Sequence, residues 1–144
     1  MGDREYIIDA SVAVKWFIPE DYSDIALGIL EGFKDLEVVL YAPDSMKLEF
    51  TNAIRKYYIR RIITGDVMNE ILEEMKKIPI NYVRIDWGLA TEALKIAVEN
   101  NITVYDAYYI AISQKRNIRV ITADEKFHSA VAEKYDVVLL RDLA

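Results

Sequence analysis

The stretch Glu5-Tyr6-Ile7-Ile8-Asp9-Ala10-Ser11 decides the fold, because it runs from a short apolar segment through a carboxylate into a helical pattern. The apolar run predicts a short buried strand over 5–9. The residues after it predict a helical turn or short helix over 11–17, which Pro19 stops. Strands made of unbroken apolar runs are typical of parallel sheets, which are covered on both faces. This stretch therefore predicts the first strand of a parallel sheet.

Strand and helix signals alternate from there to the end of the chain. Further strands are predicted at 38–41, 83–85, 118–121 and 137–140, and further helices at 23–33, 45–63, 66–77, 87–99, 104–115 and 124–134. The alternation predicts an α/β fold with a parallel sheet and helices on both faces. In such sheets ligands bind beyond the carboxyl ends of the strands, near the point where the strand order reverses.

Length and composition predict one globular domain over residues 1–144, because 53% of the residues are hydrophobic. No apolar run reaches the roughly 20 residues that span a bilayer, and the charged segment 1–6 has no signal-peptide hydrophobic region. We therefore expect a cytoplasmic protein without a membrane partner. The absence of cysteine excludes disulfides and thiolate zinc sites, and the single histidine excludes two-histidine metal motifs.

The net charge of −6 argues against a surface that coats nucleic acid generally. Four acids at unusual positions carry much of this charge, and they are Asp9, Glu49, Asp106 and Asp124. Without them, 20 acidic residues oppose 18 basic ones. The acidity therefore counts only weakly against a nucleic-acid substrate.

Three of these acids have an ordinary explanation at helix starts. Asp9 and Asp124 follow predicted strands and can cap the next helices, and Thr122 with Glu125 has the Thr-x-x-Glu spacing of a capping box. Ser11 could cap the first helix itself or orient Asp9. Asp106 falls three residues after a threonine, in the acidic position of a similar box, but apolar residues surround it on both sides.

Glu49 is harder to explain, because it lies too far from Pro43 and Asp44 to cap the predicted helix over 45–63. At about 100° per residue, it belongs to a polar stripe made of Glu49, Asn52, Lys56 and Arg60. The stripe is either an ordinary solvated face or a functional one. In the functional case, Glu49 and Asn52 face a metal pocket while Lys56 and Arg60 carry a substrate phosphate outward, with Arg60 about 16 Å from Glu49.

Clustered carboxylates repel, by about 4 kcal/mol for two unit charges 4 Å apart at an effective dielectric of 20. A cluster of the four acids therefore implies either a bound cation or raised pKa values. Oxygen ligands without histidine or cysteine favour Mg²⁺ or Mn²⁺ over Zn²⁺. Such a site can activate water and clamp a phosphoryl group, which points to hydrolysis of a phosphodiester.

With these residues in place, the chain resembles the PIN-domain ribonucleases, particularly the VapC-type toxins, over nearly its whole length. The segments that carry the likeness are 6–11, 42–53, 103–109 and 120–127. The resemblance implies a single PIN-like domain with a five-stranded parallel sheet, and a metal-binding catalytic centre of Asp9, Glu49, Asp106 and Asp124. It implies Ser11 and Thr122 as polar support. It also implies cleavage of single-stranded RNA, a homodimer, and a small cognate antitoxin that obstructs the site.

Other readings of the same residues stay open. The same nuclease could serve housekeeping RNA processing, or the chain could be a non-catalytic α/β binding module. A phosphoacceptor receiver domain and an Asp-x-Asp phosphatase fit poorly, because Ala10 and Ser11 follow Asp9. The basic patch that includes Lys56 and Arg60 could be a solvated face, a contact for RNA or a contact for an antitoxin. The tyrosines at helical spacing, Tyr109 among them, fit core or dimer contacts better than base stacking.

Overall fold

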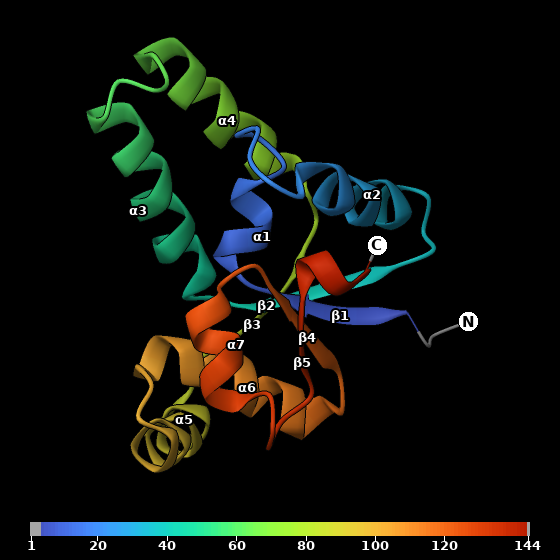
Figure 1. The fold of residues 1–144 in the computed structure, drawn as a ribbon, viewed down its shortest axis with the longest axis vertical. Helices are drawn as coiled ribbons and strands as arrows, with labels where there is room; N and C mark the ends of the chain where they lie inside the picture. Colours follow the sequence, from blue (N-terminus) through green and yellow to red (C-terminus); the bar gives the residue numbers. More distant parts are fainter. Residues whose placement is uncertain (1–3, 144) are drawn as a thin grey trace.

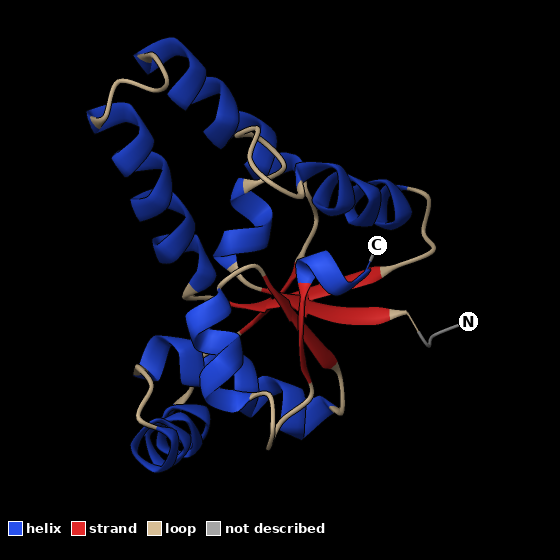
Figure 2. Cartoon of the chain, in the orientation of Figure 1, coloured by secondary structure: helices blue, strands red, loops and turns tan. Residues whose placement is uncertain are grey.

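The computed structural model describes residues 4–143, so the first three residues of the charged N-terminal segment, and Ala144, lie outside the described residues. Five strands form one sheet, and they are β1 (Glu5–Ile8), β2 (Val39–Pro43), β3 (Asn81–Val83), β4 (Arg119–Thr122) and β5 (Val137–Leu139). All neighbouring strands are parallel, in the order β3-β2-β1-β4-β5. Figure 2 shows the strands in red in the middle of the molecule, between the helices. The predicted five-stranded parallel sheet is confirmed.

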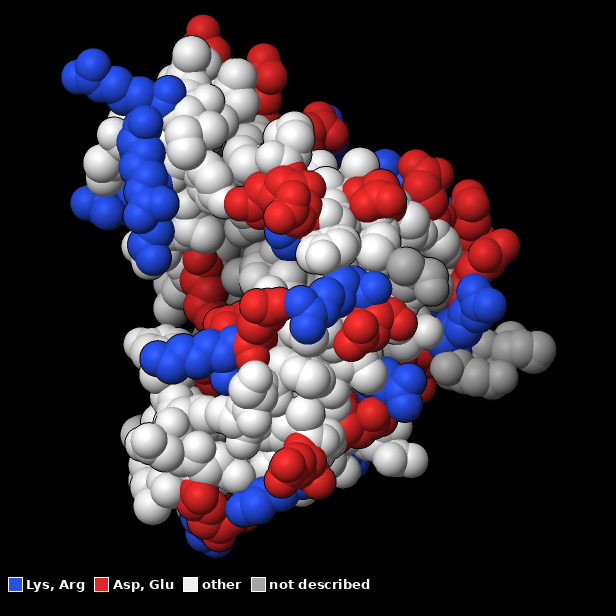
Figure 3. All heavy atoms as spheres, viewed as in Figure 1, with Lys and Arg blue, Asp and Glu red and all other residues white. Residues whose placement is uncertain are grey.

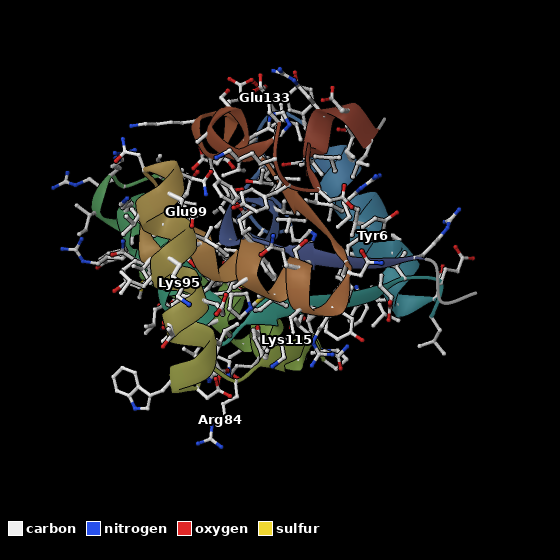
Figure 4. All side chains as sticks on the ribbon, turned by 90° about the horizontal axis from the view of Figure 1, so that it is seen from below. Tyr6, Arg84, Lys95, Glu99, Lys115 and Glu133 are labelled. Carbon is white, nitrogen blue, oxygen red and sulfur yellow. The ribbon has the colours of Figure 1, made fainter. Side chains whose placement is uncertain are left out.

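Helices cover both faces of this sheet. They are α1 (Ala10–Val14), α2 (Ser23–Lys34), α3 (Met46–Ile59), α4 (Gly65–Lys77), α5 (Trp87–Asn100), α6 (Val104–Arg116), α7 (Glu125–Val131) and the 3₁₀ helix η1 (Leu140–Leu143). Figure 1 shows α1 to α4 on one side of the sheet and α5 to α7 on the other. In the view from below, α5 carries Lys95 and Glu99 and crosses in front of α6, which contacts β2 and β4 (Figure 4).

The strand β1 occupies the centre of the sheet, between β2 and β4. Ile7 lies opposite Tyr41 of β2 on one side and Val120 of β4 on the other. Both Ile7 and Ile8 are fully buried. Because the chain moves outward from β1 to β2 and β3 and then returns to β4 on the other side, the strand order reverses between β1 and β4. Asp9 and Asp124 follow these two strands, at the place where α/β proteins bind ligands.

Several predicted boundaries shift by a few residues for local reasons. The helix predicted over 45–63 ends at Ile59, because Arg61 has a left-handed backbone with a φ of 60°. The strand predicted at 83–85 lies at Asn81–Val83, where the Asn81 amide donates to the Leu40 carbonyl oxygen and helps to fix the pairing with β2. The last predicted strand loses Leu140 to η1, and the helix predicted over 124–134 ends at Val131. No helix in residues 4–143 is long and apolar enough to cross a bilayer.

The helix α3 is anchored by the apolar residues on its inner side. Met46, Phe50 and Ile54 are each at most 2% exposed. Phe50 packs edge-on against Phe17, with ring centroids 5.9 Å apart. This packing fixes the direction of a helix whose first turn carries Glu49.

We expect Phe50→Ala to lower the free energy of unfolding by about 3–5 kcal/mol, because it leaves a cavity where an aromatic ring was buried. Urea denaturation measures the change. Leu48→Ala is the matched control, since Leu48 lies on the same helix and is 67% exposed, and it should change stability by no more than about 0.5 kcal/mol. Equal effects of the two substitutions would contradict this account of α3.

Candidate active site

Asp9 is a buried carboxylate at the end of β1, and both of its oxygens accept hydrogen bonds. The residue is 7% exposed. Ser11 Oγ donates to Oδ1 and Thr122 Oγ1 donates to Oδ2, and each oxygen–oxygen distance is 2.5 Å. The Val12 N–H donates to Oδ1 over 3.3 Å, which makes Asp9 the N-cap of α1. The predicted capping role of Asp9 is confirmed, and Ser11 orients the carboxylate instead of capping the helix.

The hydroxyl groups of Ser11 and Thr122 also join the β1–α1 junction to the β4–α7 junction. Ser11 Oγ accepts a hydrogen bond from the Ala123 N–H over 2.9 Å, and Thr122 Oγ1 accepts one from the Asp124 N–H over 3.0 Å. A hydroxyl has one proton to donate, and each of these two directs it to Asp9. The same pair of side chains therefore holds Asp9 and fixes the backbone that carries Asp124.

Asp124 is the N-cap of α7, as predicted, and its Oδ1 accepts from the Phe127 N–H over 3.0 Å. Its side chain is otherwise exposed. The predicted capping box of Thr122 and Glu125 does not form. A box needs the threonine at the N-cap, whereas Thr122 lies two residues before it and is fully buried against Asp9.

Glu49 is held by a hydrogen bond from Tyr109, a residue on α6. The Tyr109 hydroxyl donates to Glu49 Oε1 over 2.9 Å, and Tyr109 is 1% exposed. Because α3 begins at Met46, Glu49 lies in its first turn, closer to the helix start than the sequence suggests. A carboxylate there suits the helix dipole. Only the hydroxyl of Tyr109 distinguishes it from an ordinary core residue, so the sequence pattern missed this contact.

Asp106 lies on the same helix as Tyr109, three residues earlier, which places the two side chains on neighbouring parts of one face. Thr103 is the N-cap of α6, and its Oγ1 accepts from the Asp106 N–H over 3.1 Å, as predicted. The Asp106 side chain is half-buried. The helix α6 therefore brings one acid to the site and positions a second, Glu49, through Tyr109.

The carboxylates are close enough to change one another's ionisation. Burial raises the pKa of Asp9 to about 6, against the lowering effect of its hydrogen bonds, and Asp124 adds to the rise. Burial raises the pKa of Glu49 to about 7; Tyr109 opposes this, while Asp9 and Asp106 add to it. Burial and then Asp124 raise the pKa of Asp106. The four acids thus form one electrostatically coupled group.

A hollow of about 490 Å³ opens beside this group. Its lining includes Ser11, Glu49 and Asp124, together with Asn52 and Lys56 from the polar stripe of α3. Figure 3 shows acidic side chains inside a recess between α3 and α7, with basic side chains on the rim over α3. Over its first turns the stripe of α3 therefore borders the hollow, with Asn52 and Lys56 exposed to solvent there.

Arg60 lies farther out, at the C-terminal end of α3. It does not line the hollow, but it is near enough to Tyr57 to oppose the rise in that residue's pKa. Three further polar residues that the sequence pattern did not single out as site residues also line the hollow: Lys15, Glu20 and Tyr57. In the sequence Lys15 looks like an ordinary residue at the end of a helix. That it lines the hollow follows only from the packing of α1 against α3.

The chemistry of the donors fits a hard divalent cation, because the four acids offer only carboxylate oxygens. Raised pKa values are also expected when such carboxylates lie together without a counter-charge. Among residues 4–143, however, no three acidic or imidazole side chains are arranged so as to hold one ion as they stand. The fit therefore rests on the type and electrostatic coupling of the donors.

Comparison with known proteins places the whole domain in a family. The family model described as the PIN domain matches residues 6–134. Ribonuclease VapC3 of Pyrobaculum aerophilum is 25% identical over 138 residues, which cover 92% of this chain and 96% of that protein. The match therefore extends over nearly the full length of both chains.

Solved structures show the same fold. The crystal structure of PAE2754 from Pyrobaculum aerophilum has a TM-score of 0.66 at 19% identity and covers 96% of this chain and 92% of its own. A toxin–antitoxin complex from Klebsiella pneumoniae has a TM-score of 0.65 at 15% identity, with 94% and 97% covered. At these identities the likeness shows the fold alone.

We expect Tyr109→Phe to raise the pKa of Glu49 further, by about one pH unit. The substitution removes a hydrogen bond that stabilises the charged carboxylate. Carboxyl-carbon NMR of Glu49 across a pH titration measures the change. Tyr105→Phe is the control, since Tyr105 is on the same helix and is 56% exposed. An unchanged Glu49 titration in the Tyr109 variant would show that the hydrogen bond does not stabilise the carboxylate.

The raised pKa of Asp9 also predicts how stability depends on pH. The folded protein holds the Asp9 proton up to about pH 6, whereas an unfolded chain releases it near pH 4. The folded state therefore binds more protons in this window, and the Asp9 contribution to stability falls as pH rises, by about 3 kcal/mol in all.

The Asp9→Asn variant cannot ionise, so we expect its stability relative to wild type to increase between about pH 4 and pH 7. Denaturation in urea without divalent ions, repeated across this range, measures the difference. Asp66→Asn removes an exposed carboxyl of α4 and should run parallel to wild type. A difference between Asp9→Asn and wild type that shrinks or stays constant with rising pH would refute the prediction.

Proposed function

Because the chain belongs to the PIN domain family, we propose that it is a divalent-metal-dependent endoribonuclease that hydrolyses phosphodiester bonds of single-stranded RNA. The observation that carries the proposal is the coupling of four carboxylates that come from separate parts of the chain. These are Asp9, Glu49, Asp106 and Asp124. Asp9 and Asp124 directly follow β1 and β4, and Glu49 and Asp124 line the hollow.

In this proposal the four carboxylates hold Mg²⁺ or Mn²⁺. The bound ion would supply charge neutralisation and a water of lowered pKa for attack on the phosphodiester. The hydrogen bonds that Ser11 and Thr122 donate favour the ionised form of Asp9, which is the form that binds a cation, and they oppose the effect of burial. Tyr109 does the same for Glu49. Asn52 can donate to a substrate oxygen at the wall of the hollow, and Lys56 can neutralise a phosphate there.

We expect Asp9→Asn to abolish Mn²⁺-dependent cleavage of short single-stranded RNAs, because it removes a central carboxylate without changing its shape. The Asp106→Asn variant should behave in the same way. Circular dichroism and thermal unfolding check that each variant is folded, and Asp66→Asn is the control that should cleave at the wild-type rate. Full activity in the folded Asp9→Asn variant would sink the proposal.

We further propose that the nuclease is the toxin of a toxin–antitoxin pair, with a small cognate antitoxin as partner and a homodimer as the active assembly. Support comes from the full-length match to a protein named ribonuclease VapC3 and from the shared fold with the chain of a toxin–antitoxin complex. Arg60 at the far end of α3 would then contact either RNA or the antitoxin. Expression of wild type, but not of Asp9→Asn, should arrest growth, and co-expression of the adjacent small gene should relieve the arrest.

Two other functions make different predictions. A housekeeping RNA-processing nuclease would cleave RNA but would be encoded by a solitary gene and would not arrest growth. A non-catalytic α/β binding module would show no divalent-ion binding in calorimetry, and its four acids would titrate independently. Asp9 and Asp106 raise the pKa of Glu49, and Asp124 raises those of Asp9 and Asp106, which favours the nuclease over the binding module.

A further inference from the structure

A second hollow, of about 410 Å³, lies next to the one that Glu49 and Asp124 line, here called the acidic hollow. The two share Lys15 and Ala123 as lining residues, so they meet at these two side chains. Ala123 is the residue directly before Asp124, and its N–H donates to Ser11 Oγ. An extended ligand that leaves the acidic hollow on this side therefore passes Lys15 and enters the second hollow.

Lys15 is a sheltered cation at this junction. Its side chain is 12% exposed, and its only ion pair among the described residues is with Glu20, over 3.4 Å from Nζ to Oε1. The other oxygen of Glu20 accepts a hydrogen bond from the Tyr57 hydroxyl. An ammonium group has three protons to donate, and the single long contact to Glu20 leaves donor capacity facing the hollows. Lysine is rarely sheltered to this degree without a strong partner.

The second hollow combines an aromatic ring, an apolar floor and charged walls. Tyr22 is 47% exposed at its edge, with a left-handed backbone (φ 67°) that turns the chain before α2. Leu139 and Leu140 are at most 5% exposed and form the floor. The wall charges are Asp21, Glu125 and Arg141, of which the last two form an ion pair with each other.

We propose that the second hollow is a subsite for the nucleotide that flanks the scissile phosphate, with its base against Tyr22 and its phosphate on Lys15. This inference rests on the proposed ribonuclease function. Aromatic rings bind unpaired bases of single strands by stacking, whatever the sequence, and a lysine is a point-charge ligand for phosphate. The carboxylate of Asp21 makes the Tyr22 end unfavourable for a phosphate and leaves Lys15 as the site for it. The groups across the two connected hollows thus match successive parts of one RNA strand.

Binding of short fluorescent RNAs to the full chain carrying Asp9→Asn tests the subsite without cleavage. Lys15→Met in this background should raise the dissociation constant about tenfold. It should also reduce the slope of log affinity against log salt by about 0.7, the loss of one phosphate contact with a single strand. Glu20→Gln frees Lys15 from its ion pair and should tighten binding. If Glu20→Gln tightens binding equally with and without Lys15, only the lost carboxylate charge acts, and the proposal fails.

Tyr22→Ala should also weaken binding about tenfold, with an unchanged salt slope, while Tyr22→Phe keeps the ring and should bind like its parent. RNAs that carry one abasic nucleotide at successive positions locate the subsite. At one position, and no other, Tyr22→Ala should cease to matter. Equal losses at every position, or no loss in either the Lys15 or the Tyr22 variant, would overturn the subsite.

The outcome is separable from that of the nuclease proposal. If the Asp9→Asn parent binds no RNA, and wild type cleaves none, the proposed function itself is wrong. If the parent binds RNA and the variants bind equally well, only the subsite is wrong. Thermal unfolding of each variant checks its fold, and Tyr22, being exposed and outside the core, keeps the test decisive if Lys15→Met is unstable.

Discussion

The hydrogen bonds from Ser11 and Thr122 to Asp9 are the constraint on which the site depends. They join the ends of β1 and β4, the two strands between which the sheet reverses its order. The same hydroxyls accept the N–H groups of Ala123 and Asp124. The buried carboxylate of Asp9 thus links the ends of the two strands through these hydroxyls. The same hydrogen bonds fix the backbone position of Asp124, the second acid.

Burial and hydrogen bonding act on these carboxyls in opposite directions, and burial wins. The pKa of Asp9 rises to about 6 and that of Glu49 to about 7, although each carboxylate accepts hydrogen bonds that favour its charged form. Such an arrangement costs stability near neutral pH. Sites of catalysis and ion binding are where proteins keep groups in this condition, and the raised pKa values therefore support a functional reading over a merely structural one.

Much of this site could be predicted from the sequence, since Asp9 and Asp124 follow apolar runs and parallel strands end at one edge. The sequence marks Glu49 as a candidate site residue because a carboxylate at its position has no strong structural explanation. The role of Tyr109 could not be predicted, because a buried tyrosine at helical spacing has the same pattern as a core residue. Lys15 was not predicted for a related reason: its ion-pair partner Glu20 lies in the loop that follows it, and Tyr57, which donates to Glu20, lies on α3. Thr122 belongs to β4, and its hydroxyl bonds to Asp9 instead of forming the capping box that its spacing from Glu125 suggested.

The long helix α3 extends from the acidic hollow to a distant part of the surface. Glu49 is in its first turn, fastened to Tyr109, and Arg60 ends it on a part of the molecule that stands away from the sheet (Figure 1). The buried ring of Phe50 fixes this helix next to Glu49, whereas Lys56 and Arg60 are exposed toward its other end. A partner that bound the exposed end of α3 would therefore contact the same helix that positions Glu49, without entering the hollow.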